Sequence, residues 1–344
     1  MSECLDDELL LGFVERRLDL ETTARVEDHI DACAACRRLL AMLAPTEAPS
    51  SGSEHASEGE DSVVEGYAME EVIGEGAMGR VFAARDRQTG ERVAVKVMRA
   101  DARELVERFA REAAFMAQVS HPNVVGIRRV VEVGTGGTLA LVMDLLEGRT
   151  LEDQLQEAPA LSVAEAGRIG ICLARAAGAA HAHGIIHRDI KPANVFLETA
   201  SDGPARVRLL DFGLAKLFRV HPTASTLGRL TASGAVLGTP AYMAPEQVRG
   251  DSDIDPRADV WAVAAVIYRL LAGRAPVVGR GFADIFRRVG EPIAPVESLR
   301  PETPPAICRV IGRALAVDRE ARPADGNALA SELSGVPATT SIGK

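Results

Sequence analysis

Aromatic residues are scarce in this chain of 344 residues, at 4% of the sequence with a single tryptophan. A core therefore has to be built mainly from Leu, Val, Ile and Ala, which the 47% hydrophobic content allows. Long apolar runs are also missing. The longest, residues 260–272, is too short to span a bilayer and contains Tyr268 and Arg269. It predicts a buried helix, and we expect no transmembrane segment.

The chain has no basic stripe, and its formal net charge is −10. This excludes the electrostatic footprint of a nucleic-acid-binding protein. The acidity is confined to the beginning of the chain. Residues 1–44 carry ten acids and five bases, residues 45–66 carry six acids and no base, and the remainder has a net charge of +1.

Cysteine is rare, and three of the five cysteines, Cys4, Cys33 and Cys36, fall in the first 36 residues. The acidic start of the chain does not resemble a signal peptide. An odd cysteine count without such a signal favours a reducing, cytoplasmic location. We therefore interpret the three early cysteines as metal ligands rather than disulfide partners.

The pattern of residues divides the chain into four parts. Residues 1–44 have helical spacing, and residues 45–66 are an acidic flexible linker too polar to form a core. Residues 67–146 are mostly strand-like, with one helix expected near 104–119, and residues 147–335 are mostly helical. Residues 336–344 form a disordered tail. The fold class predicted is α+β, with a small β-rich lobe before a larger helical lobe.

A glycine-rich segment opens the strand-like part, where Gly74, Gly76 and Gly79 fit the pattern G-x-G-x-x-G-x-V that ends at Val81. Glycines let a backbone approach phosphate oxygens closely. The pattern by itself is weak evidence, because it also fits a simple hairpin turn or a dinucleotide-binding turn. Strand-like residues follow it here instead of a helix, which favours a hairpin over a nucleotide.

Lys96 ends an apolar strand, where a lone lysine is costly unless it is paired. One candidate partner is Glu112, on the single helix expected in this lobe. The alternative is that Glu112 pairs with Arg108 on the helix surface, at i, i+4 spacing. The residues alone leave both readings open.

Residues 187–197 place Asp189, Lys191 and Asn194 at fixed offsets in one short loop. Phosphoryl transfer needs three such groups, which orient a hydroxyl, neutralise the migrating phosphoryl group and hold a metal. The loop therefore predicts transfer of phosphate.

Five segments now come in the order of the protein-kinase signature set. They are Gly74 to Val81, the Val-Ala-Val-Lys run ending at Lys96, His187-Arg188-Asp189, Asp211-Phe212-Gly213 and Ala244-Pro245-Glu246. Over about residues 67–335 the chain resembles a bacterial eukaryotic-type serine/threonine protein kinase. The resemblance implies a bilobal kinase fold, with lobes 67–146 and 147–335, that transfers the γ-phosphate of ATP to protein Ser or Thr hydroxyls.

The resemblance also implies residue roles. Asp189 orients the substrate hydroxyl, Lys191 bridges toward the γ-phosphate, and Asn194 and Asp211 hold Mg²⁺ or Mn²⁺. Lys96, held by Glu112, contacts the α- and β-phosphates. Lys191 followed by Pro192 resembles Ser/Thr kinases rather than tyrosine kinases.

The expected nucleotide site combines the glycine-rich segment with a hinge at residues 141–146. Met143 resembles the gatekeeper, although ordinary core packing explains it equally well. The backbone of Asp144 and Leu146 is expected to bond the adenine edge. The full expected set is Ile73, Gly74, Glu75, Gly76, Ala77, Met78, Gly79, Arg80, Val81, Ala94, Lys96, Met143, Asp144, Leu146 and Phe196.

Arg188 indicates regulation, because an arginine before the catalytic aspartate is usually neutralised by a phosphate on the activation loop. We expect autophosphorylation at Thr231, with Ser233 second, while Thr239 is structural. By resemblance, Glu246 and Arg322 form a buried ion pair and Asp259 holds the catalytic-loop backbone. One departure from the family is that Ala264 and Ala265 lie where glycine is common.

His29, Cys33 and Cys36 form the pattern H-x3-C-x2-C, whose ligands can share one tetrahedral Zn²⁺. The segment resembles the zinc-binding anti-sigma-factor domain, and so few residues need a staple of this kind. Cys4 is the expected fourth ligand, with the carboxylates Asp6, Asp7 and Glu8 as alternatives. The other reading is a helical hairpin with packed cysteines.

Three rival functions remain. The first is a pseudokinase scaffold, but the presence of Lys96, Asp189 and Asp211 argues against it. The second is a sigma-factor-binding protein that is regulated by its kinase part. The third is a small-molecule kinase, which is disfavoured because residues 238–246 resemble a peptide-docking loop. We expect protein substrates, a sigma-factor-like or regulatory partner for residues 1–44, and no nucleic acid. A homodimer is left open.

Overall fold

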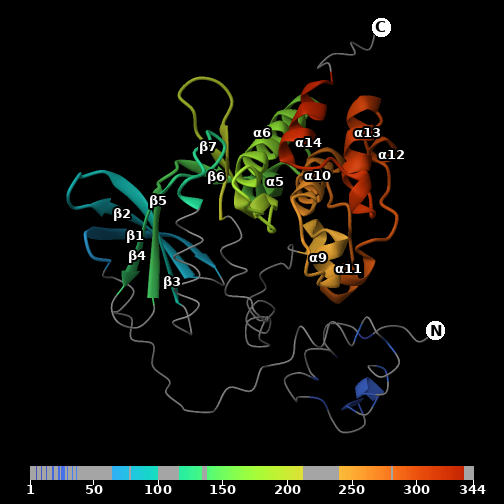
Figure 1. Ribbon diagram of the computed structural model, residues 1–344, viewed down its shortest axis with the longest axis horizontal. Coiled ribbons are helices and arrows are strands. Elements are labelled where there is room, and N and C mark those ends of the chain that lie inside the picture. Colours follow the sequence, from blue (N-terminus) through green and yellow to red (C-terminus); the bar gives the residue numbers. More distant parts are fainter. Residues whose placement is uncertain are drawn as a thin grey trace.

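The computed structural model describes residues 64–76, 79–99, 116–133, 138–211, 240–279 and 282–336, together with isolated residues between 5 and 36. The larger part consists of a sheet-rich lobe and a helical lobe that lie side by side (Figure 1). This is the α+β bilobal architecture predicted from the sequence.

The first lobe is a five-stranded antiparallel sheet of order β1-β2-β3-β5-β4. Its strands are β1 (Tyr67–Gly76), β2 (Gly79–Asp86), β3 (Arg92–Arg99), β4 (Ile127–Val133) and β5 (Thr138–Asp144). In β3, Val93 and Val95 join one apolar cluster, while Ala94 and Met98 join the other. Because side chains alternate along a strand, Lys96 belongs to the face of Ala94 and Met98.

The sheet begins at Tyr67, the predicted boundary, but the packed lobe begins earlier, within the segment predicted as linker. Val64, counted with the linker in the sequence, is only 1% exposed and packs in the same cluster as Tyr67 and Phe82. The amide of Tyr67 donates to the carbonyl of Val64 at 3.0 Å. Val64 is therefore part of the packed lobe. Most of the expected linker and of the helix near 104–119 lies outside the described residues.

Gly79 shows why the glycine-rich segment needs its last glycine. Its φ is +141°, and a Cβ atom there would lie 1.9 Å from the carbonyl oxygen of Val97 on β3. Only glycine fits this conformation and this close approach. At Gly74, by contrast, a Cβ atom would make ordinary contacts with Val81.

A second, three-stranded sheet of order β6-β7-β8 lies in the part predicted as mostly helical. Its strands are β6 (Gly148–Thr150), β7 (Val195–Glu198) and β8 (Arg206–Leu209). They are too short for the alternation of apolar residues to be read from sequence. The short helix η2 (Pro192–Asn194) leads directly into β7, so this sheet anchors one end of the predicted catalytic loop.

The helical lobe surrounds α10 (Arg257–Ala272), which confirms the buried helix predicted at 260–272. Ala264 and Ala265 are fully buried within it. The other elements are α5 (Leu151–Glu157), α6 (Val163–His181), η3 (Pro240–Tyr242), α9 (Pro245–Arg249), α11 (Phe282–Arg288), α12 (Val296–Leu299), α13 (Pro305–Ala314), η4 (Arg319–Ala321) and α14 (Gly326–Ser334). Among the described residues, no helix is both long and apolar enough to cross a membrane.

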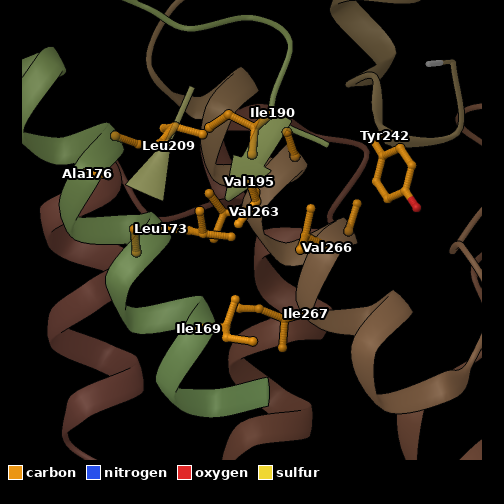
Figure 2. Packing of buried hydrophobic residues seen from close by; sticks show 14 of the residues in the cluster. Ile169, Leu173, Ala176, Ile190, Val195, Leu209, Tyr242, Val263, Val266 and Ile267 are labelled. Carbon is orange, nitrogen blue, oxygen red and sulfur yellow. The ribbon is translucent and has the colours of Figure 1, made fainter. Parts of the chain in front are cut away.

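Aliphatic side chains fill the contact between α6 and α10. Figure 2 shows Ile169 of α6 facing Ile267 of α10, with Leu173 of α6 opposite Val263. The four side chains are at most 1% exposed. Branched aliphatic residues thus replace the missing aromatics in this core, as the composition predicts.

Helix α14 approaches α6 unusually closely. A Cβ atom on Gly326 would lie 2.4 Å from both the carbonyl oxygen of Ala174 and the amide nitrogen of Gly178. This approach brings the amide of Gly326 to 3.1 Å from Nδ1 of His181, the last residue of α6. The close packing of α14 against α6 therefore positions His181, which lies near the predicted catalytic loop.

Candidate active site

The three polar residues of the predicted catalytic loop lie within hydrogen-bonding distance of one another. Nζ of Lys191 is 3.0 Å from Oδ2 of Asp189. The side-chain amide of Asn194 donates to the same oxygen at 3.0 Å and to the carbonyl of Asp189 at 2.8 Å. The amide nitrogen of Asn194 thus faces Asp189, which leaves its oxygen as the atom that can face a metal.

Asp259, on α10, holds the backbone before Asp189 in place. Its fully buried carboxylate accepts from the amides of His187 and Arg188, each at 2.7 Å. Arg188 has a φ of +63°, which is strained for a side chain of this size. The two hydrogen bonds stabilise this unfavourable turn, as the resemblance implied for Asp259.

His181 is a third partner of Asp259 that the sequence reading missed. Its Nε2 lies 2.9 Å from Oδ2 of Asp259, while its Nδ1 accepts from Gly326. Burial works to raise the pKa of Asp259, but the hydrogen bonds that its carboxylate accepts, above all the one from His181, outweigh it and lower the pKa. The carboxylate therefore stays ionised, and its stabilising effect is present at neutral pH and lost in acid.

Two hydrogen bonds connect the catalytic loop to the segment before Asp211. Nε2 of His187 lies 2.8 Å from the carbonyl of Leu210, and the amide of Leu210 donates to the carbonyl of Asn194 at 2.9 Å. Asp211 itself has a φ of +48°. Leu210, which directly precedes Asp211, thus connects the two expected metal ligands, Asn194 and Asp211.

Lys96 reaches Asp211 across the two lobes. Its Nζ is 2.7 Å from Oδ2 of Asp211, and the lysine side chain is 11% exposed. The predicted site residues of the first lobe and of the helical lobe therefore meet at one place. Glu112, the expected partner of Lys96, lies outside the described residues.

Asn123 makes a second connection between the lobes, which the sequence reading also missed. Its side chain donates to the carbonyl of Val207 at 2.8 Å, and its own carbonyl accepts from the amide of Leu209 at 2.8 Å. Both partners belong to β8, just before Asp211. A bare asparagine in a loop carries no sequence signal for such a contact.

The expected adenine pocket lies at the sheet face that Lys96 shares. Ala94 and Met143 are paired across β3 and β5 and are 5% and 8% exposed. Val81 and Leu146 are partly buried against the same cluster. Phe196 lies on β7, while Ile73 on β1 is 47% exposed. Ala77 and Met78 lie outside the described residues.

The ion pair expected between Glu246 and Arg322 is present and buried. Nη1 of Arg322 lies 2.6 Å from Oε1 of Glu246, and Nη2 lies 2.9 Å from Oε2. The guanidinium lies 5.0 Å from the ring centre of Trp261. The neighbouring Gln247 donates to the carbonyl of Arg188 at 2.9 Å. The segment after residue 239 is thus tied to the catalytic loop.

The N-terminal ligands predicted from H-x3-C-x2-C also come together. The ligand atoms of His29, Cys33 and Cys36 all lie within 4.8 Å of one another. Within the described residues, Nε2 of His29 is buried with no hydrogen-bond partner. A tetrahedral zinc ion holds such ligand atoms about 3.5–3.8 Å apart. The cluster therefore fits a zinc ion after a small adjustment. Cys4 lies outside the described residues.

A family model described as "Protein kinase domain" matches residues 67–332. The chain belongs to the protein kinase family. A second model, described as "Putative zinc-finger", matches residues 6–37, which include the His29, Cys33 and Cys36 cluster.

Curated bacterial kinases are similar over the same region. The chain is 38% identical over 281 residues to serine/threonine-protein kinase pkn3 of Myxococcus xanthus, covering 78% of this chain and 50% of that protein. It is 33% identical over 279 residues to PknA of Mycobacterium tuberculosis, covering 79% and 61%. The match thus spans about half the length of these relatives.

Among solved structures, the Mycobacterium tuberculosis PknI kinase domain matches with a TM-score of 0.61 and 28% identity. The match covers 79% of this chain and 97% of that one. The similarity therefore extends over a whole kinase domain, both lobes included.

Proposed function

We propose that the protein is an ATP-dependent serine/threonine kinase that transfers the γ-phosphate of ATP to protein hydroxyls. One observation carries the proposal. Lys96, the loop that holds Asp189 and Asn194, and Asp211 come from three separate segments of the sequence, and contacts of 2.7–3.0 Å link them into one site. The names of the relatives, which are bacterial serine/threonine-protein kinases, support the class of acceptor.

In this mechanism, Asp189 orients the acceptor hydroxyl and receives its proton as the phosphoryl group departs from ATP. The transition state is loose, so positioning matters more than the basicity of the carboxylate. Lys191, which already contacts Asp189, supplies positive charge to the migrating phosphoryl group.

The nucleotide and its metal fit the groups around Lys96. Asn194 and Asp211 offer amide and carboxylate oxygens, which Mg²⁺ or Mn²⁺ prefers, and the bound ion would neutralise charge on the phosphates. Lys96 would contact the α- and β-phosphates, with Glu112 as its partner on the predicted helix. The purine would lie between Ala94 and Phe196, bonded by the backbone of Asp144 and Leu146, with Met143 behind it.

An assay of γ-phosphate transfer from ATP to a protein acceptor tests the proposal, with Asp189→Asn as its control. A pseudokinase would bind nucleotide without transferring phosphate. The protein belongs to that class if the wild type and Asp189→Asn incorporate equal phosphate.

We also propose that the kinase is switched on by phosphorylation of its own activation loop. Arg188 is exposed, and it makes no ion pair within the part of the chain that the structure describes. A phosphate nearby would form a charge-assisted pair with it. The candidate acceptors, Thr231 and then Ser233, lie outside the described residues.

Incubation with ATP followed by phosphopeptide mapping should find phosphate within residues 219–237, mainly on Thr231. Asp189→Asn should carry none, because the phosphate comes from the protein itself. Phosphate confined to other segments of the active wild type would contradict the switch.

We propose a zinc-binding module at residues 1–44, with His29, Cys33, Cys36 and Cys4 as ligands, joined by the tether 45–66 to the kinase domain 67–335. Thiolate and imidazole donors at this spacing suit Zn²⁺. The module would bind a sigma-factor-like or other regulatory protein. The enzyme would be cytoplasmic, and two copies of the chain could form a homodimer. Residues 336–344 would form a free tail.

Purified full-length protein should contain about one zinc ion per chain, and Cys33→Ser should lose it because a serine hydroxyl is a poor zinc ligand. Cys172→Ser is the matched control, because Cys172 lies on α6 and should leave the zinc content unchanged. Equal zinc in wild type and Cys33→Ser would rule the site out.

A further inference from the structure

We propose that Arg269 selects protein acceptors that carry an acidic residue close to the phosphorylated Ser or Thr. This inference rests on the proposed kinase function and names its substrate class. Arg269 lies in the last turn of α10, and its Nη1 donates to the carbonyl of Pro159 at 2.5 Å, just after α5. It is half-buried, between two elements that reach the active site.

Both neighbours of Arg269 border the path of an acceptor to Asp189. Helix α5 packs against η2, which contains Asn194 of the catalytic loop. Helix α10 packs against η3, the segment that leads into α9. Gln247 of α9 in turn donates to the carbonyl of Arg188 in the catalytic loop. An acceptor hydroxyl that reaches Asp189 therefore brings its flanking residues between α5 and η3.

Tyr242 of η3 connects Arg269 to this path. Figure 2 shows its ring beside Val266 of α10, with the hydroxyl directed away from the apolar cluster. Arg269 lies three residues after Val266, on the same face of the helix. Burial, followed by the charge of Glu152, raises the pKa of Tyr242, and the Arg269 guanidinium beside the hydroxyl opposes that rise. The hydroxyl therefore stays neutral.

Among the described residues Arg269 makes no ion pair, and its guanidinium donates instead to the neutral carbonyl of Pro159. On α5, Asp153 is occupied as the capping partner of Thr150, and Glu157 pairs with Arg149. Glu152 is thus the acid of α5 left beside Arg269. Near the catalytic loop, Lys191 and the exposed Arg188 add two positive charges against Asp189. An acidic residue next to the acceptor would find Arg269 available to pair with it, and a basic one would be repelled by Arg269.

The test uses full-length kinase and a set of Ser/Thr peptides that differ only in one flanking residue, which is Glu, Gln or Lys at each position in turn. For at least one position, kcat/KM of the wild type should favour Glu over Lys by about fivefold, the size expected for a half-exposed charge pair. Arg269→Glu should remove or invert that ratio, and Arg269→Lys should keep it. The matched control, Arg309→Glu, changes an exposed arginine on α13 and should also keep it.

A purely structural role for Arg269 predicts a different result. Arg269→Glu would then lower kcat/KM on the Glu, Gln and Lys peptides by the same factor, and this outcome overturns the proposal. So does a wild-type enzyme that uses the Glu and Lys peptides equally well. If Arg269→Glu does not fold, Arg269→Gln replaces it, with loss of the preference as the expected result. A wild type that phosphorylates no peptide and no protein acceptor rejects the kinase function itself, so the two failures are distinct.

Discussion

Replacing Asp189 with asparagine should lower the kcat of phosphate transfer by about 10²–10⁴-fold, the usual contribution of a positioned proton acceptor. The two contacts of the Asp189 side chain, from Asn194 at 3.0 Å and Lys191 at 3.0 Å, need only an oxygen acceptor. Asparagine keeps one such oxygen, so the loop should hold its shape. What it loses is the negative charge that orients the hydroxyl and receives its proton.

The measurement is incorporation of the γ-phosphate of ATP into a protein acceptor, together with the affinity for ATP. Nucleotide affinity should be nearly unchanged, because Lys96 and Asp211 remain. Asp202→Asn, in an exposed turn of the same lobe, is the matched control and should keep full activity. A drop in kcat of less than about tenfold would contradict the role proposed for Asp189.

Replacing Arg322 with methionine should destabilise the helical lobe by about 3–5 kcal/mol, because it leaves the carboxylate of Glu246 buried without a cation. The Arg322 side chain is 0% exposed and that of Glu246 is 1% exposed. All five N–H donors of the guanidinium are used. Two go to Glu246, and the others go to the carbonyls of Ala316, Arg257 and Val317.

Thermal unfolding measures the effect, and a loss of this size corresponds to a Tm lower by on the order of 10 °C. Adding Glu246→Gln to the same chain should recover part of the loss, because the second change removes the buried charge. The control is Arg313→Met, which breaks the exposed pair with Glu332 and should cost about 1 kcal/mol or less. If Arg322→Met and Arg313→Met lower the Tm equally, the buried pair contributes no more to stability than the exposed pair.

The sequence predicts local chemistry well where the residues involved lie close together in the chain. Asp189, Lys191 and Asn194 are spaced by two and three positions in one loop, and their proximity follows from the chain itself. The apolar run at 260–272 likewise predicted α10, since a buried helix needs only its own residues and a surrounding core. The strands β6 to β8 were missed because three or four residues hold too little periodicity.

The roles of some residues could not be read from sequence at all. Gly79 looked like a phosphate-loop glycine, but the structure shows in addition that the backbone of Val97 excludes any side chain there. Asn123 and His181 have no motif around them. Each is informative only because a segment distant in sequence lies against it.

The sequence by itself therefore determined the chemistry: a kinase signature, the residue types of the site, and a metal-binding pattern at His29, Cys33 and Cys36. Tertiary structure alone decided how that chemistry is held. Asp259 supports a loop 72 residues before it, His181 receives an amide 145 residues after it, and Lys96 meets Asp211 across two lobes. The physical reason is that local periodicity reports which face of an element is buried. It does not report which distant backbone group will fill the space against that face.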